Sequence, residues 1–503
     1  RGKSYVSTHV KSNLRPLRIV HAPRRSLHCS AMSEPVVEAG LPPVSRAGLT
    51  PRWVWPAIAL LAAATVVSSP VLGSPLGLVL PGFVVLALAG VFVWRSPLLA
   101  ASFVPALMPP PQFAKVFAYE VALLFTAGLV LLAGLRARRE WIWKLDAIEA
   151  AVAGLLLWAV CTGFWSESLW WWTFGVRKMG IGFLALWTAW RLGRCFQDRW
   201  LPFGIVTGIY ALGLATLVKA ASVGAFTAGS SYSRSEGTSL GWGTSNFIGT
   251  LLVLMLPTAL HMALHDPRRG MRVTAWMTLP LVALVVAVAA SRGGALLVVL
   301  VALLLVFGGR VRRSTFLVLA GVALAIAALL AGPGGAQLLE RFTSPRELGS
   351  VVVRLLYFRE GWHRLLEYLP WGMGLGQGFV QLDRLATVDP HNYWLVVGPE
   401  LGLPGLALWV TVLVLIWRRA QAMARSAQTR AMARTLQFTL IISQVNSLYE
   451  PTFQGLQYQF LFYWIVGTCL GGGSAAVAVT SAGEESASDQ LRAGITDPPR
   501  SAT

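Results

Sequence analysis

Long apolar runs alternate along the chain with short polar or basic segments. A helix needs about 20 apolar residues to cross a bilayer. Runs that fit this length predict spanning helices at 54–72, 76–94, 117–135, 146–164, 175–192, 200–222, 246–264, 273–290, 293–308, 315–331, 392–416, 435–449 and 453–471. The proline-interrupted stretch 96–112 is interpreted as a short span or a re-entrant segment. The pattern predicts an all-α fold, a polytopic membrane helix bundle with about 12–14 transmembrane helices.

Composition supports this prediction. Of the 503 residues, 55% are hydrophobic and 13% are charged, and the mean hydropathy is +0.61. A soluble globular protein carries about 25% charged residues, so the chain lacks the polar surface of an ordinary cytoplasmic enzyme. The composition also excludes a disordered protein. The few cysteines have no metal-ligand spacing and predict neither a disulfide framework nor a zinc site.

The net charge of +20 could indicate a nucleic-acid partner, but the distribution of the charge argues against one. Basic runs separate the apolar segments, as the positive-inside rule produces. They lie at 136–144, 191–199, 265–272, 309–313 and 417–434. If 96–112 crosses the membrane, all five fall on one side. We therefore predict that this side, with both termini, is cytoplasmic.

The two ends of the chain differ from the membrane domain predicted over 51–472. Residues 1–50 are basic and are predicted to be disordered; a natural start at Met32 is favoured over an organelle transit peptide. Residues 473–503 are rich in Ala, Gly, Ser and acidic residues, which predicts a disordered cytoplasmic tail.

The longest predicted extracytoplasmic loop, 332–391, carries more arginine than orientation pressure favours on that side. Its arginines are Arg341, Arg346, Arg354, Arg359, Arg364 and Arg384. This enrichment indicates an anionic ligand.

Within the loop, 351–369 has the periodicity of an amphipathic helix that lies at the membrane interface or against the bundle. Arg354 falls on or beside the apolar face and points toward the protein. A buried arginine needs a partner, and a salt bridge, snorkelling or a bound anion would each satisfy it.

Two further residues are predicted at the same rim of the bundle. Arg292 lies in the tight turn 291–294 between two apolar runs, at the outer membrane boundary. Arginines there are costly, which favours a functional role over an interface anchor. His391 follows Asp389 and Pro390 near a helix start, where an imidazole can accept a proton at neutral pH. Taken alone, it would be read as a surface histidine.

Other chemical motifs are weak. His261 and His265 lie four residues apart but lack a catalytic glutamate, which favours a structural role. The glycine-rich run 372–378 lacks the strand and helix of a dinucleotide site and is interpreted as a flexible turn. No paired carboxylates lie on the outer side, so we predict no metal and no cofactor.

Four sequence motifs together resemble the O-antigen ligase and polymerase superfamily of bacterial membrane glycosyltransferases. They are GTSNFIG (243–249), SRGGALLVVLVALLL (291–305), RLLYFREGWHRLLEYLPWGMGLGQGF (354–379) and HNYWLVVGPELGLPGLAL (391–408). Their order and spacing also fit the family, and the resemblance covers about residues 240–410.

The resemblance implies transfer of a glycan from undecaprenyl diphosphate to an acceptor hydroxyl, without metal or nucleotide, at the periplasmic face of the bacterial cytoplasmic membrane. The acceptor would be lipid A–core, another glycan or a protein. His391 would act as general base, while Arg292 and Arg354 would bind and stabilise the diphosphate leaving group. Substrate binding is further predicted for Arg177, Arg234, Asn246, Arg359 and Asn392.

Three alternatives remain. An O-antigen polymerase or a protein O-oligosaccharyltransferase of the same superfamily would use the same residues. A lipid-linked glycan flippase would place polar groups near the bilayer midplane and would often show inverted repeats, and neither is evident here. A structural membrane subunit would leave the arginines of the loop unexplained.

Overall fold

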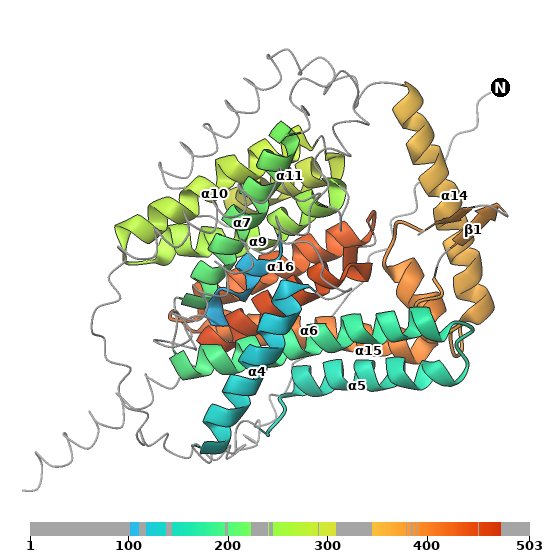
Figure 1. The fold of residues 1–503 in the computed structure, drawn as a ribbon, viewed down its shortest axis with the longest axis horizontal. Helices are drawn as coiled ribbons and strands as arrows, with labels where there is room; N and C mark the ends of the chain where they lie inside the picture. Colours follow the sequence, from blue (N-terminus) through green and yellow to red (C-terminus); the bar gives the residue numbers. More distant parts are fainter. Residues whose placement is uncertain are drawn as a thin grey trace, which may run out of the picture. The chain divides into compact units, whose positions relative to one another are not determined.

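The chain folds into a bundle of long helices with one short strand pair (Figure 1). The computed structural model describes residues 101–109, 117–136, 143–196, 200–222, 240, 245–289, 291–307, 345–378, 380–383, 386–388, 390–450 and 452–473. Its helices are α4 (Ala118–Arg136), α5 (Ala147–Cys161), α6 (Leu169–Phe196), α7 (Trp200–Ser222), α9 (Ser245–His265), α10 (Arg269–Val288), α11 (Arg292–Phe307), α14 (Pro345–Tyr368), α15 (Trp394–Arg425), α16 (Arg430–Ser447) and a last helix over 456–473, with 3-10 turns η2 (Val104–Leu107), η4 (Thr162–Phe164) and η5 (Thr452–Gln454). The predicted polytopic all-α fold is confirmed.

Six of the described helices, α4, α5, α7, α9, α10 and α15, are long and apolar enough to cross a membrane. The protein is therefore a multi-pass membrane protein. The spans predicted at 54–72, 76–94 and 315–331 lie outside the described residues, as do the basic segment 1–50 and the tail from 474 onward. The total of about 12–14 spans thus stays a prediction.

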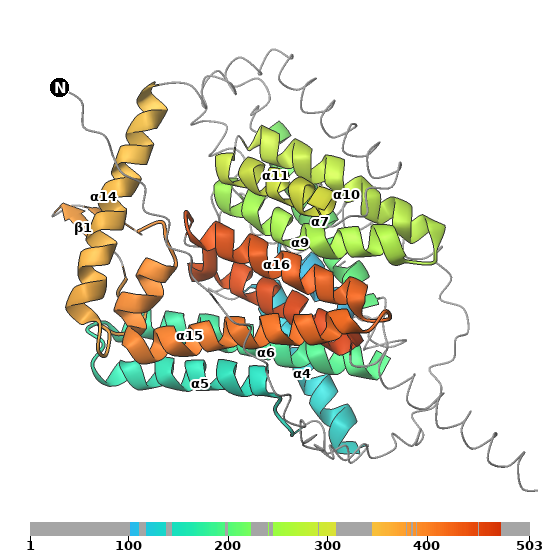
Figure 2. The same ribbon diagram turned by 180° about the vertical axis from the view of Figure 1, so that it is seen from behind.

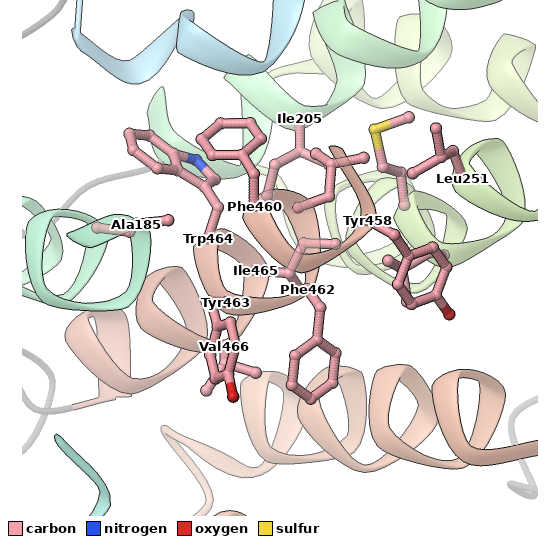
Figure 3. Packing of buried hydrophobic residues seen from close by; sticks show 14 of the residues in the cluster. Ala185, Ile205, Leu251, Tyr458, Phe460, Phe462, Tyr463, Trp464, Ile465 and Val466 are labelled. Atoms are coloured by element: carbon pink, nitrogen blue, oxygen red, sulfur yellow. The ribbon is translucent and has the colours of Figure 1, made fainter. Parts of the chain in front are cut away.

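The last helix, 456–473, lies in the core of the bundle. The side chains of Phe460, Phe462 and Trp464 are fully buried although they leave the helix in different directions (Figure 3). A helix that is apolar on every side is suited to such a central place. Because lipid tails are as apolar as this core, close van der Waals packing must hold the helices together.

Glycines allow this close packing where the last helix meets α6. A Cβ atom added at Gly193 would lie 2.7 Å from the Cα of Gly471. One added at Gly467 would lie 2.6 Å from the carbonyl oxygen of Leu186. Small residues at such crossings let two membrane helices approach until their backbones touch.

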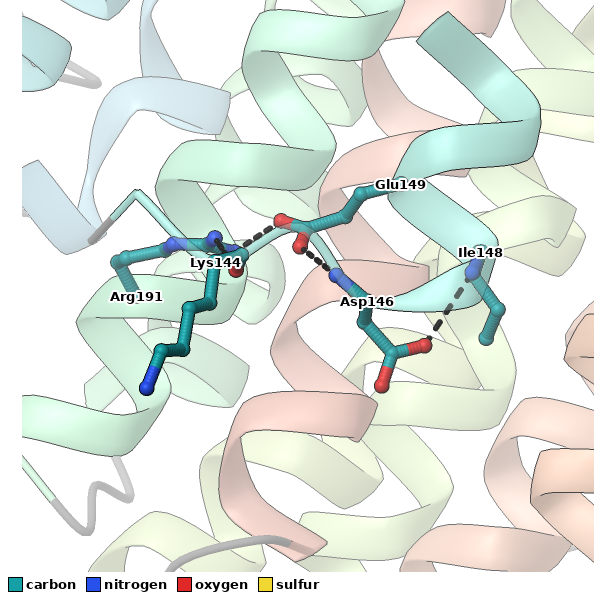
Figure 4. A network of polar contacts seen from close by, with 5 residues as sticks. All are labelled: Lys144, Asp146, Ile148, Glu149 and Arg191. Carbon is teal, nitrogen blue, oxygen red and sulfur yellow. Dashed lines mark hydrogen bonds and ion pairs between the residues drawn. The ribbon is translucent and has the colours of Figure 1, made fainter. Parts of the chain in front are cut away.

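A buried ion pair joins α5 to α6 (Figure 4). The guanidinium of Arg191 donates through Nη1 to Glu149 and through Nη2 to the Lys144 carbonyl (3.1 Å), and both paired side chains are 1% exposed. Glu149 also accepts from the backbone N–H of Asp146 (2.9 Å), whose own carboxylate accepts from Ile148 N–H (3.2 Å). This capping box starts α5 while its glutamate neutralises the arginine.

A break inside α15 fixes the glycine-rich loop. Gly402 has φ +65° and ψ −167°, so two helical segments meet there. Near the break, the Glu400 carbonyl accepts from Gly374 N–H (3.1 Å) and its carboxylate accepts from Gly378 N–H (2.8 Å). Backbone groups left over at a helix break need such partners. The run 372–378, interpreted from the sequence as a flexible turn, is thus held by hydrogen bonds to α15.

Helix α14 lies across one end of the bundle. It covers the helix predicted over 351–369 up to Tyr368, and it runs crosswise to α5, α6 and α15 (Figures 1 and 2). After the loop come two short antiparallel strands, β1 (Val380–Asp383) and β2 (Ala386–Val388), with Val380 opposite Val388. The sequence analysis did not predict this strand pair. It leads the chain from α14 back to the start of α15.

Candidate functional site

The segment from Ser447 to Gly455 joins α16 to the last helix and meets the first turns of several other helices. The carbonyl of Ser447 accepts from the backbone N–H of Tyr393, just before α15 (2.8 Å). A Cβ atom at Gly455 would lie 2.2 Å from the ring of Phe247 in the first turn of α9. The segment therefore gathers parts of the chain that are far apart in sequence.

A single carboxylate in this segment joins two of the three residues that the sequence analysis had placed at the centre of the chemistry. Arg354 Nη2 of α14 donates to Glu450 Oε1 at 3.1 Å. Nδ1 of His391 lies 3.6 Å from Glu450 Oε2. The side chain of Glu450 is 11% exposed, whereas those of Arg354 and His391 are 35% and 30% exposed. The three groups thus form a polar cluster that is partly open to the outside.

The backbone conformation of His391 is unusual. Its φ is +52°, and within the part of the chain that the structure describes no other non-glycine residue has a positive φ. Such a conformation costs about 1–3 kcal/mol and persists only where the surroundings fix it. The ring of Tyr357 stacks on the imidazole with a centroid distance of 5.8 Å, and Pro390 packs beside Gly361 of α14. The imidazole is therefore held between α14 and Glu450.

Asn392 fixes the start of α15. Its Oδ1 accepts from the N–H groups of Trp394 (2.9 Å) and Leu395 (3.2 Å), which is the role of a helix cap. Its Nδ2 donates to the carbonyl of Leu448 (3.1 Å). The side chain predicted to bind substrate is thus engaged on both of its polar atoms, next to the histidine that it helps to place.

Arg292 is the first residue of α11. The next residue, Gly293, accepts a hydrogen bond through its carbonyl from the hydroxyl of Tyr449 (3.1 Å). A Cβ atom at Gly293 would lie 2.9 Å from the Tyr449 ring, so glycine allows this approach. Since Tyr449 directly precedes Glu450, this hydrogen bond ties the start of α11 to the segment that carries Glu450.

No hydrogen bond or ion pair joins the remaining predicted substrate-binding residues to this cluster among the residues that the structure describes. Arg177 of α6 is paired with Glu120 of α4, with Nε–Oε1 at 2.9 Å and Nη2–Oε2 at 2.5 Å. Arg359 is on the exposed side of α14, and Arg234 lies outside the described residues. Asn246 is the second residue of α9, and its Oδ1 is buried and without a hydrogen-bond partner in the structure. Their roles in substrate binding stay predictions.

The sequence analysis missed Glu450. It had looked for paired carboxylates, and this residue stands alone in the short connection between the runs 435–449 and 453–471. A lone charge between two apolar runs, on the side that also carries Arg354 and His391, was the available signal. Over the described residues, no group of three side chains could hold a metal ion.

These observations define a polytopic helical membrane protein with an arginine–glutamate–histidine cluster at one end of its bundle. Residues 277–410 match the family model described as O-antigen ligase, which confirms the resemblance to that superfamily. The matched region includes Arg292, Arg354 and His391 but ends before Glu450. No curated protein matches the chain. The family match supports a membrane glycosyltransferase function.

Proposed function

We propose that this protein transfers a glycan from undecaprenyl diphosphate to an acceptor hydroxyl at the extracytoplasmic face of the bacterial cytoplasmic membrane, in the manner of an O-antigen ligase. One observation carries the proposal. Arg354 and His391 come from different elements and meet on the same carboxylate, Glu450. A cation for a phosphate and a base for a hydroxyl are the two groups that this reaction needs.

The arginines serve the donor. A guanidinium carries five N–H donors in a planar fork, and in Arg354 one nitrogen, Nη2, contacts Glu450. With a side chain 35% exposed, the fork can turn further donors toward diphosphate oxygens, a geometry that arginine binds well. Arg292, at the start of α11, supplies a second positive charge in this proposal. Together they stabilise the negative charge that grows on the leaving group.

The histidine serves the acceptor. The proposal places the Nδ1 proton of His391 on the side of Glu450 Oε2, 3.6 Å away, which leaves the lone pair on Nε2. Nε2 then takes the hydroxyl proton while the acceptor oxygen bonds to the anomeric carbon and the bond from that carbon to the diphosphate breaks. The lipid diphosphate leaves, and the anomeric centre is inverted. Glu450 is a positioning residue that fixes the tautomer and stabilises the imidazolium.

The test uses purified protein in lipid nanodiscs and measures glycan transfer as the release of undecaprenyl diphosphate. His391→Ala should lower the rate by about 10²–10⁴-fold, the usual contribution of a general base. His363→Ala is the matched control, because that histidine lies on the exposed side of α14 with its side chain 76% exposed. Wild-type transfer by His391→Ala, with the protein intact in the membrane, would remove the assignment.

The product then identifies the acceptor class. After deletion of the gene, loss of long-chain lipopolysaccharide on electrophoresis of the surface glycolipids supports a ligase. Capping by single repeat units supports a polymerase, and loss of glycan from glycoproteins supports a protein O-oligosaccharyltransferase. Each outcome keeps the chemistry at His391 and changes only the molecule that carries the hydroxyl.

A further inference from the structure

Helix α14 has two stripes with the same spacing, offset by one residue. Arg354, Tyr357 and Gly361, at i, i+3 and i+7, form the stripe that faces the protein. Arg354 contacts Glu450 and Tyr357 stacks on His391. A Cβ atom at Gly361 would lie 3.2 Å from Leu395 and from Pro390. One side of α14 is thus packed on the polar cluster and on the start of α15.

The second stripe is apolar and is not covered by the described residues. It consists of Leu355, Phe358, Trp362 and Leu366, which are 63%, 42%, 55% and 59% exposed. We call these four residues the outer stripe. An uncovered apolar surface of this kind marks a site for a membrane or a partner.

Tryptophans lie just after α14 and at the end of the spanning helix α5. Trp371, just after α14, is 65% exposed and lies 6.3 Å from Trp158 of α5 between ring centroids. Trp158 in turn lies 5.8 Å from Trp165, whose indole donates to the Gly372 carbonyl (3.1 Å). Tryptophans gather where a bilayer meets water. This end of the bundle therefore lies at the level of a membrane interface.

The arrangement of α14 agrees with that level. The helix runs crosswise over the end of α5 and α15 rather than along them (Figures 1 and 2). On its far side, the side chains of His363 and Glu367 are 76% and 53% exposed and lie 3.9 Å apart. Apolar residues on one face and charged residues on another are typical of a helix that lies in the interface plane.

We propose that the outer stripe binds the lipid surface, so that α14 lies in the boundary between headgroups and acyl chains of the adjoining leaflet. The bilayer then covers Leu355, Trp362 and Leu366, while Arg354 on the neighbouring stripe is held at the depth of lipid phosphates. This inference requires no transfer chemistry and goes beyond the proposed function. The occupant is the bilayer rather than a protein, because the tryptophan that follows α14, Trp371, meets Trp158 of the spanning helix α5.

The test is photo-crosslinking of the full-length chain in nanodiscs of phosphatidylethanolamine and phosphatidylglycerol. A photoreactive amino acid replaces Leu355, Trp362 or Leu366 in separate variants, and lipid adducts are measured by mass spectrometry. The control on the other face of α14 is the same replacement at His363. The control for a lipid-facing position is Leu157 of α5, which is 65% exposed within a spanning helix.

Lipid adducts at the three stripe positions should match the yield at Leu157 and exceed that at His363 several-fold. Equal yields on both faces of α14 would overturn the proposal. So would stripe positions that give no lipid adduct while Leu157 does, or that crosslink to a second protein chain instead. Every position lies on the exposed surface, and therefore the replacements should leave the fold intact.

Discussion

Glu450→Gln offers the sharpest test of the cluster. The carboxylate has two oxygens, and Oε1 accepts from Arg354 at 3.1 Å while Oε2 lies 3.6 Å from His391. An amide has the same shape but a single acceptor oxygen. It can serve the arginine or the histidine, but not both. The substitution therefore separates the chemistry of the carboxylate from its packing.

Both orientations of the amide impair the site. If the oxygen faces Arg354, the NH₂ group faces Nδ1 of His391, which places the imidazole proton on Nε2 and removes the lone pair that the reaction needs. If the oxygen faces His391, the NH₂ group meets the guanidinium, whose nitrogens are also donors. A charge-assisted hydrogen bond contributes about 1.5–3 kcal/mol, and a lost general base costs about 10²–10⁴-fold in rate. We expect kcat/KM to fall by about 10²-fold or more.

The assay is release of undecaprenyl diphosphate by purified variants in nanodiscs, with thermal unfolding as the measure of stability. Glu360→Gln is the matched control, because Glu360 pairs with Arg364 at 3.4 Å on the same helix, α14, away from the cluster. Such surface pairs contribute about 0.3–0.5 kcal/mol, so the control should keep its activity. An unchanged kcat/KM for Glu450→Gln would refute the role of the carboxylate in orienting the imidazole.

Two further predictions concern the scaffold and are measured by thermal unfolding in detergent. Gly402→Ala should destabilise the protein by more than about 1–2 kcal/mol, the cost of a left-handed backbone with a side chain, because φ is +65° and the new Cβ would lie 2.5 Å from the Trp371 carbonyl carbon. The control is Gly128→Ala, where a new Cβ would have nothing within 4 Å, and this variant should be neutral or stabilising. Equal effects of the two substitutions would contradict the reasoning. Glu149→Ala should lower the free energy of unfolding by about 3–5 kcal/mol, because it leaves Arg191 buried without its charge partner. Replacing both residues by apolar ones of similar size should restore most of that stability. An unchanged stability of the single variant would show that the pair is not needed.

The ends of several helices could be predicted from the sequence. The span expected at 200–222 coincides with α7, and the one at 246–264 differs from α9 by one residue at each end. Bilayer thickness sets the length of an apolar run, so hydropathy locates these helices well. Helix α6 is longer than its predicted span 175–192, because tryptophans before it and arginines at its end continue the helix. The total number of spans stays a prediction.

The internal geometry of α15 could not be predicted in the same way. Its apolar run reads as one continuous span, yet Gly402 divides it. A glycine in a membrane helix is common, and its sequence does not show whether the backbone turns there. Whether the helix breaks at this glycine depends on the glycine-rich loop, whose N–H groups donate hydrogen bonds to the carbonyl and the carboxylate of Glu400. That loop is near α15 only in the folded chain.

The residues of the candidate site were likewise predicted only in part. The sequence pointed to Arg292, Arg354 and His391 because a charged or titratable group at the rim of an apolar bundle is costly and therefore informative. It did not indicate Glu450, and it did not indicate that the side chain of Asn392 accepts from the first N–H groups of α15. Whether Asn392 also meets a substrate stays a prediction.

By itself, the sequence determined that this chain is a helical membrane protein that resembles the O-antigen ligase superfamily over part of its length, and it determined which side chains are able to carry charge or accept a proton. These properties follow from residue identity and from spacing within single segments. Only the tertiary structure decided that Arg354 and His391 share one carboxylate, and that the described part of the chain leaves the outer stripe of α14 uncovered while its neighbouring stripe packs on the cluster. Those relations join segments tens of residues apart, and packing between helices, rather than the local pattern, creates them.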